Sequence, residues 1–114
     1  MNKKYRLRKN YQFNFVYKNG KAVSNEFCTV VFCKNKASVP RVGYSVSKKF
    51  GKAVKRNRAK RRMKEAVGSF FVKMNASCNY IFLPKPPCLD ANFAVLKLSM
   101  EKLLQKAGLI KAES

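Results

Sequence analysis

Histidine is absent from the chain, and acidic residues are scarce. The 114 residues contain no histidine and five acids, which are Glu26, Glu65, Asp90, Glu101 and Glu113. Metal-assisted cleavage of a phosphodiester needs carboxylates gathered around magnesium, and these acids are scattered along the chain. Without histidine, general acid–base catalysis would fall to Tyr, Lys or Cys. The sequence therefore indicates no catalytic residue and no metal ligand, and it argues against a nuclease that cuts by itself.

Long apolar runs are also missing. No stretch approaches the length of a membrane span, and the basic residues that follow Met1 lead into no apolar core of a signal peptide. We therefore expect a cytoplasmic protein that has no association with a membrane.

The four cysteines do not form a recognisable metal or disulfide framework. Cys28 and Cys33 are an odd number of residues apart on a predicted strand, so they should point to opposite faces of a sheet. Cys78 and Cys88 flank a proline-rich turn, and no histidine is present to complete a zinc site. We expect reduced, partly buried thiols and no cofactor bound by the protein.

Positive charge dominates the composition. Lys and Arg number 26, so the formal net charge is +21, while 46% of the residues are hydrophobic. Such an excess opposes compact folding unless a polyanion joins the protein. An anionic membrane surface and a nucleic acid both qualify, but dispersed charge with this apolar fraction favours a folded nucleic-acid binder. The length predicts one domain over residues 1–114, which opens with a basic arm at residues 1–9.

The first third of the chain predicts a helix and two strands. Asn10 is expected to N-cap a helix that ends at Asn19–Gly20 with a left-handed glycine, and Phe13, Val16 and Tyr17 then share one face. Residues 27–33 and 41–47 read as strands. The segment between them is short enough for a hairpin loop, so we expect the two strands to be antiparallel neighbours.

A long helix should follow over residues 53–73, entered by a turn at residues 48–52 that contains Gly51. At 100° per residue one arc of this helix is apolar and should face the sheet. The arc consists of Ala59, Met63, Ala66, Val67 and Phe70.

The last third predicts a strand and a helix. Residues 80–83 read as a strand that Pro84 closes, and Asp90 is expected to cap a helix that ends at Gly108. The apolar positions of this helix recur at the helical period and are Phe93, Leu96, Met100, Leu103, Leu104 and Ala107. The order is helix, two or three strands, helix, strand, helix, which predicts an α+β fold with helices laid on one sheet.

Residues 45–66 carry ten of the 26 basic side chains, with Glu65 as their only acid. A solvated helix face is the plain alternative, but such faces usually mix charges of both signs at i, i+4. Here like charges repel unless phosphates neutralise them. Several of the cations are Arg, whose planar guanidinium pairs bidentately with phosphate or stacks on a base.

Within this run, Lys48–Arg61 resembles the signature KKxGxAVxRNxxKRxxRE of the bacterial ribonuclease P protein family. Nearly every fixed position matches, and the clear departure is Lys64, where the pattern has Arg. Residues 41–47 resemble the family's RVGxSVS strand, and residues 103–109 resemble its closing LLKRAGL. The opening residues 6–10 with Phe13 are similar as well, so the resemblance spans essentially the whole chain.

The resemblance implies a fold and an activity. The fold is a single-domain, two-layer α/β sandwich in the order α-β-β-β-α-β-α, with an unusual left-handed βαβ crossover, similar to the second domain of ribosomal protein S5. The activity is that of an accessory subunit of an endoribonuclease. The partner is a catalytic RNA, which requires Mg²⁺ and itself removes the 5′ leader from precursor tRNA. The protein is expected to bind the leader, to assist the RNA on other structured RNAs, and to need no obligate protein partner.

The resemblance also implies two sets of contact residues. Contacts to the catalytic RNA would come from Lys48, Lys49, Lys52, Arg56, Asn57, Arg58, Lys60, Arg61, Arg62 and Lys64. The leader would be bound by Phe13 and Tyr17, with Val31 at the strand position where the family usually has an aromatic. Phe27 is expected on the same face of the strand, where it would compensate. The plain alternative for these aromatics is a place in the core.

Two other classes of protein share the composition. A small basic ribosomal protein, or another structural RNA-binding protein, has similar size, charge and mixed α/β character. A DNA-binding module is the third alternative, although the sequence has no short helix-turn-helix pattern.

Overall fold

Four strands form one mixed sheet in the part of the chain that the computed structural model describes, residues 5–36 and 39–110. In their order across the sheet they are β1 (Lys21–Ser24), β2 (Cys28–Lys34), β4 (Cys78–Pro84) and β3 (Arg41–Tyr44). β1 pairs with β2 antiparallel, β2 with β4 antiparallel, and β4 with β3 parallel.

The prediction that β2 and β3 pair as an antiparallel hairpin is wrong. β4 lies between these strands, and Ile81 of β4 stands opposite Val31 on one side and Gly43 on the other. Part of the connecting loop, residues 37–38, lies outside the described residues. Parallel neighbours need a crossover connection, which α2 (Ala53–Phe70) provides between β3 and β4. The predicted βαβ unit is therefore present, and its left-handed sense stays a prediction.

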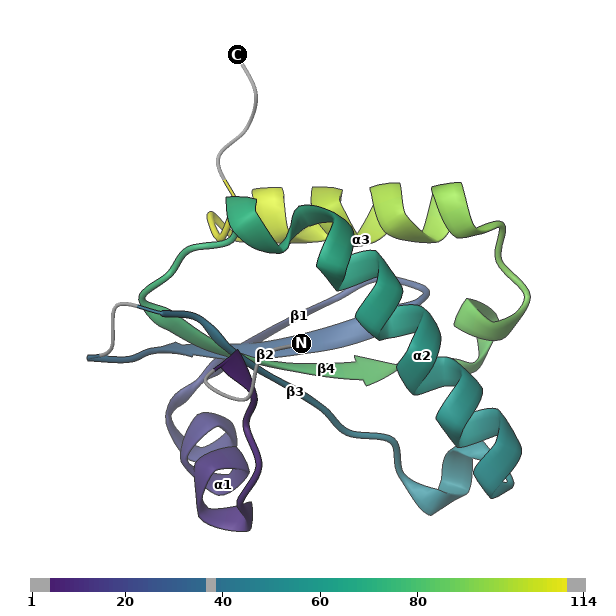
Figure 1. The fold of residues 1–114 in the computed structure, drawn as a ribbon, viewed down its shortest axis with the longest axis horizontal. Coiled ribbons are helices and arrows are strands. Elements are labelled where there is room, and N and C mark those ends of the chain that lie inside the picture. Colours follow the sequence, from purple (N-terminus) through teal and green to yellow (C-terminus); the bar gives the residue numbers. More distant parts are fainter. Residues whose placement is uncertain (1–4, 37–38, 111–114) are drawn as a thin grey trace.

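Three α-helices complete the order α-β-β-β-α-β-α. They are α1 (Asn10–Asn19), α2 (Ala53–Phe70) and α3 (Phe93–Lys106), with short 3₁₀ turns at Lys48–Phe50, Phe71–Lys73 and Pro86–Leu89. Figure 1 shows α1 and α3 on opposite sides of the sheet. The α+β class and the element order match the prediction, and β1 is the third strand that the sequence left open.

The main core lies where α2 and α3 cover one face of the sheet. All five residues of the predicted apolar arc of α2 are buried in it, and α3 adds Leu96, Met100, Leu103 and Leu104. These two helices form the second layer of the predicted sandwich. A smaller cluster on the other face joins Val16 of α1 to Leu7, Cys33 and Ile81. Cys28 belongs to the main core, so Cys28 and Cys33 lie on opposite faces, as expected.

The four cysteines are free thiols in buried positions. Burial, reinforced by the nearby Cys88 and opposed by Lys85, raises the pKa of Cys28 to about 12. Burial also raises the pKa of Cys33, Cys78 and Cys88. Each thiol therefore favours its neutral form.

Two helix ends differ from the sequence-based expectation. Gly20 follows α1 with φ −93°, so the prediction that this helix ends at a left-handed glycine is wrong. A Cβ at Gly20 would lie 2.5 Å from the Val16 carbonyl oxygen and 2.7 Å from that of Phe32, so close backbone contact requires the glycine. The side chain of Asn92, not of Asp90, caps α3 by accepting a hydrogen bond from the Ala94 amide at 2.9 Å.

The first helix also begins differently from the expectation, because Lys9 occupies the N-cap position and Asn10 is already helical. Part of the predicted basic arm is docked on the sheet. Arg6 forms a parallel bridge with Val42 of β3, and the Leu7 amide donates to the Val42 carbonyl at 3.0 Å. The ring of Tyr5 packs edge-on against Phe71, with 5.2 Å between centroids. Residues 1–4 of the arm lie outside the described residues.

Candidate nucleic-acid interface

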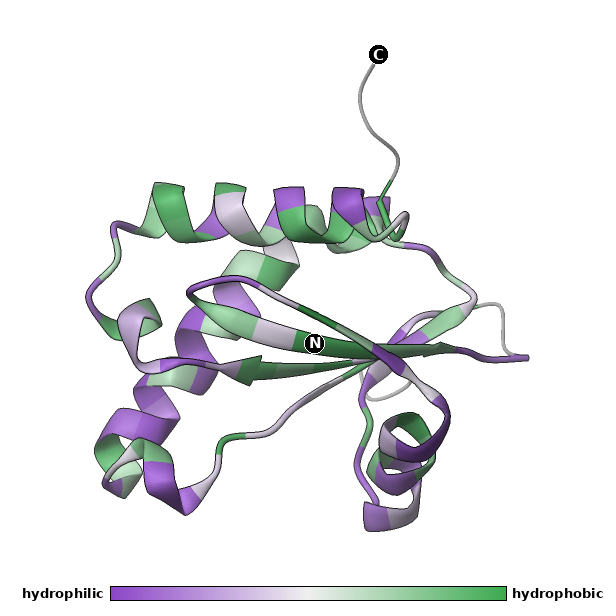
Figure 2. Cartoon of the chain, turned by 180° about the vertical axis from the view of Figure 1, so that it is seen from behind, coloured by the Kyte–Doolittle hydropathy of each residue, from purple (hydrophilic) through white to green (hydrophobic). Residues whose placement is uncertain are grey.

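The residues expected to contact RNA lie on α2 and on the 3₁₀ turn before it. We call them the basic face, which comprises Lys48, Lys49, Lys52, Arg56, Asn57, Arg58, Lys60, Arg61, Arg62 and Lys64. Arg56, Lys60 and Arg62 are partly buried, and the other seven are exposed. In Figure 2 the half of α2 nearest the 3₁₀ turn is mostly hydrophilic. The structure thus brings all ten residues together on one helix and its entry.

No acid neutralises the basic face within the described part of the chain. None of its cations forms an ion pair with another described residue. The ion pair between Lys73 and Glu101, with 3.1 Å between Nζ and Oε1, lies beyond the C-terminal end of α2. Unpaired cations on one helix repel one another, and a polyanion relieves this repulsion.

The N-terminus of α2 adds partial positive charge next to the basic face. Lys52 is its N-cap residue and makes no capping hydrogen bond through its side chain. The first amides of a helix have no partner inside the helix, and the helix dipole places partial positive charge there. With Lys48 and Lys49 exposed on the preceding turn, this end of α2 suits a phosphate group.

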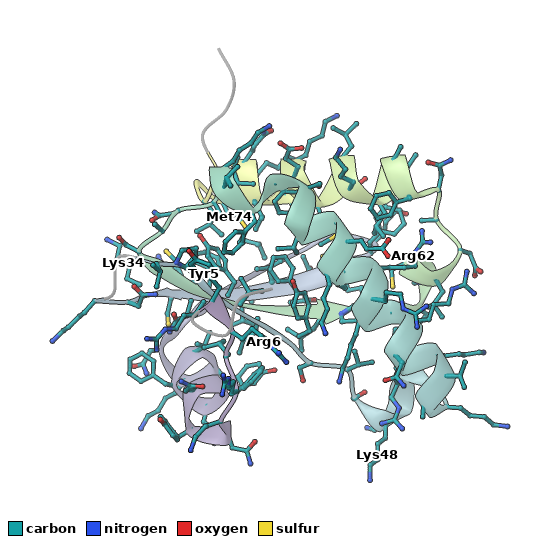
Figure 3. The ribbon with its side chains drawn as sticks, viewed as in Figure 1. Tyr5, Arg6, Lys34, Lys48, Arg62 and Met74 are labelled. Atoms are coloured by element: carbon teal, nitrogen blue, oxygen red, sulfur yellow. The ribbon has the colours of Figure 1, made fainter. Side chains whose placement is uncertain are left out.

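Two arginines of the basic face also hold the fold together. Nη2 of Arg58 donates to the carbonyl oxygen of Leu89 at 3.3 Å, and Nη2 of Arg62 donates to that of Ala91. Figure 3 places Arg62 on the side of α2 that faces the connection to α3. Sequence reasoning missed this structural role. The sequence did contain a pattern that indicates this role. The two arginines are spaced i, i+4, and each directly precedes a residue of the buried arc, Ala59 or Met63.

Lys64 connects α2 to the edge of the sheet. Its Nζ lies 5.8 Å from the centroid of the Tyr44 ring on β3, a cation–π distance. Burial raises the pKa of Tyr44, and its hydroxyl has no hydrogen-bond partner. Lys64 is nevertheless exposed, so its ammonium group is accessible to a ligand while its position is held over β3.

On the other face of the sheet, α1 presents aromatic side chains. Phe13 is partly buried against the small cluster, and a Cβ at Gly43 would lie 2.5 Å from its Cζ, so the ring rests on the glycine. Tyr17, one turn later, is 43% exposed. Val31 of β2 packs against the same cluster and is partly exposed. We call Phe13, Tyr17 and Val31 the α1 surface.

Phe27 does not join the α1 surface, so its expected place on the face of Val31 is wrong. It is 7% exposed and belongs to the main core on the opposite face of the sheet. Phe27 lies in the bend before β2, which begins at Cys28, so the alternation of the strand does not extend to it. Phe27 is therefore a core residue.

Two further aromatics of α1 were not singled out by sequence reasoning. Tyr11 is 68% exposed and Phe15 is 54% exposed. Their i, i+4 spacing places them on one side of the helix, away from the buried Val16. This spacing was the available signal.

Metal clusters and membrane-spanning helices were both sought among the described residues. In residues 5–36 and 39–110, no three His, Cys, Asp or Glu side chains are grouped so that they could share a metal ion. Among these residues, none of the helices has the length and apolar character needed to cross a bilayer.

Known proteins match the chain in both sequence and structure. The family model described as Ribonuclease P matches residues 1–108. The ribonuclease P protein component of Thermoanaerobacter sp. (strain X514) is 39% identical over 104 residues, which cover 91% of this chain and 90% of that protein. The component of Symbiobacterium thermophilum is 38% identical over 114 residues, with 99% of each chain covered.

Solved structures agree with the match in sequence. The RNase P protein of Staphylococcus aureus superposes with a TM-score of 0.81 at 33% identity, covering 94% of this chain and 98% of that one. The RNase P protein of Thermotoga maritima gives a TM-score of 0.79 at 28% identity, covering 89% and 96%. These matches favour neither the ribosomal nor the DNA-binding alternative. The chain belongs to the bacterial ribonuclease P protein family, whose members are the protein component of the tRNA-processing endoribonuclease.

Proposed function

We propose that the basic face binds the RNA subunit of ribonuclease P while the α1 surface binds the 5′ leader of precursor tRNA. In this arrangement the RNA subunit cleaves the phosphodiester, and the protein holds the leader beside it. The proposal assigns RNA contacts to all ten residues of the basic face, with Arg58 and Arg62 using the guanidinium nitrogens that do not bind the main chain.

The observation that carries the proposal is that the two surfaces meet at β3. Neighbouring residues of this strand contact both of them, since Gly43 lies against the ring of Phe13 and Tyr44 lies beneath the ammonium group of Lys64. An RNA subunit bound along α2 and a single strand bound at α1 would therefore be separated by one strand of the sheet.

Each surface suits its proposed ligand by its chemistry. Cations without acidic partners bind phosphates regardless of sequence. Exposed aromatic rings stack on unpaired bases with little preference among them, at about 1–3 kcal/mol per base. Such contacts tolerate many leader sequences, and they would extend to other structured RNAs.

We assign the Mg²⁺ that supports cleavage to the RNA subunit. Proteins hold Mg²⁺ mainly through carboxylate oxygens, and the described residues contain no cluster of carboxylates that could do so. The protein's own contribution would be to lower the repulsion between RNA phosphates and to position the leader. We place this work in the cytoplasm, without a membrane or an obligate protein partner.

Binding to the RNA subunit as a function of salt concentration tests the basic face. Arg61→Ala should weaken assembly and reduce the slope of log K against log salt by about one, since one phosphate contact is lost. Lys102→Ala, which removes an exposed charge from α3, is the matched control. Equal slopes for both variants and the wild type would overturn the assignment of the basic face.

A further inference from the structure

A pocket opens beside α1 at the end of the sheet. Its volume is about 510 Å³, which lies within the range of small-ligand sites. Its lining includes Phe15 and Asn19 of α1, Lys21 of β1, Lys34 of β2 and Asn75 before β4, together with apolar residues of the sheet and of the segment after α3. Gly108, after α3, also lines the pocket.

This pocket is separate from both surfaces described above. None of the residues of the α1 surface or of the basic face lines it. At 100° per residue, Phe15 points about 160° away from Phe13 and from Tyr17, so the helix stands between the pocket and the α1 surface. Figure 3 shows Lys34 and Lys48 at opposite ends of the molecule.

The lining combines an aromatic ring with unpaired positive charge. Phe15 is 54% exposed. Lys21 and Lys34 form no ion pair with any other described residue, and no acid lines the pocket. A half-exposed ring that lines the same pocket as two cations is suited to a planar group that carries a phosphate.

The two amide side chains supply hydrogen-bonding groups for such a ligand. Asn75 accepts a hydrogen bond from the Ser77 amide at 2.9 Å through Oδ1, and its Nδ2 has no partner among the described residues. Asn19 donates from Nδ2 to the Phe15 carbonyl at 2.9 Å, which leaves its Oδ1 to accept. One donor and one acceptor are therefore free to meet the edge of a base.

We propose that this pocket binds one unpaired nucleotide of RNA, with the base stacked on Phe15 and the phosphate at Lys21 and Lys34. The inference rests on the proposed function, because it requires single-stranded RNA to reach α1. It extends that function by placing a second single-strand site on the opposite flank of the helix. A nucleotide in a duplex is stacked on both faces and would not enter.

Titration of the ¹⁵N-labelled full-length protein with oligouridylate, followed by NMR, tests this inference. The amide of Gly108 and the side-chain amides of Asn19 and Asn75 report on the pocket, while the amide of Gly43 reports on the α1 surface. In the wild type both sets of signals should shift, and a duplex RNA of the same length should leave the pocket signals in place.

Substitutions on α1 distinguish the two sites. Phe15→Ala should weaken the binding seen by the pocket reporters about tenfold, because one stacking interaction is lost, and should leave the response of Gly43 unchanged. Tyr17→Ala should weaken the response of Gly43 and leave the pocket reporters unchanged. Tyr11 is an exposed aromatic outside the pocket, so Tyr11→Ala should change the response of neither set of reporters.

The inference is overturned if the pocket reporters do not shift in the wild type, or if they shift equally in Phe15→Ala. A shift of the Gly43 signal alone would contradict nucleotide binding in the pocket and would support binding of single-stranded RNA at the α1 surface. The proposed function is tested independently by leader-dependent cleavage, so its failure would be seen in a different assay.

Discussion

Nη2 of Arg62 on α2 donates a hydrogen bond to the carbonyl oxygen of Ala91, just before α3 begins. Arg58, one turn earlier, makes the same kind of bond to Leu89. Both bonds hold the segment between β4 and α3 against the helix that carries the basic face. The arginine-rich motif therefore serves the packing of the protein as well as its charge.

Arg62→Ala should lower the free energy of unfolding by about 1–3 kcal/mol, because it removes a partly buried charged donor and leaves the Ala91 carbonyl without this bond. Arg61→Ala, at the neighbouring exposed position, should change stability by less than about 0.5 kcal/mol. Urea denaturation of both variants measures the difference. Equal stabilities would show that the Arg62 bond contributes nothing to the fold.

Gly43→Ala should destabilise the protein by about 1–3 kcal/mol, since its Cβ would meet the ring of Phe13 at 2.5 Å and the Leu7 Cβ at 3.1 Å. Much of this cost should disappear when the substitution is made together with Phe13→Ala. A double-mutant cycle in urea measures the coupling. Additive effects of the two substitutions would contradict the contact between Phe13 and Gly43.

Stability should fall at alkaline pH because buried thiols resist ionisation in the folded state. The pKa of Cys28 rises from 9.0 to about 12, so an unfolded chain loses this proton earlier than the folded one. The folded state thus binds more protons above pH 9, and stability is full below that value and declines from there towards pH 12. The raised pKa values of Cys33, Cys78 and Cys88 act in the same direction.

The midpoint of urea denaturation at neutral pH and at about pH 10 measures this decline. Cys28→Ala should make the decline shallower, although it lowers stability at neutral pH by creating a cavity. If the wild type and Cys28→Ala lose the same stability over this interval, the shift at Cys28 is not its source.

The sequence predicted local features well where periodicity decides them. The arc of α2 from Ala59 to Phe70 is buried as expected, because a helical period fixes which side chains share a face. Gly108, with φ 76°, ends α3 as expected, since a left-handed residue there favours glycine. The placement of Cys28 and Cys33 on opposite faces followed from the strand period alone.

Features that depend on distant parts of the chain were not predictable in the same way. The segment between β2 and β3 is short enough for a hairpin, but β4, more than thirty residues after β3, pairs with both strands and separates them. Phe27 matched the alternation of β2, yet the strand begins one residue later. Asp90 and Asn92 are both good capping residues, and the 3₁₀ turn at Pro86–Leu89 delays the helix to Phe93.

Cleavage of precursor tRNA by a bacterial ribonuclease P RNA at low magnesium tests the central claim most directly. The protein should restore cleavage of a substrate with a long leader and should help a leaderless one much less. Tyr17→Ala should lose about tenfold of the leader-dependent gain, and Tyr11→Ala should retain it. Equal stimulation of both substrates, or an unchanged gain with Tyr17→Ala, would contradict the role of the α1 surface in binding the leader.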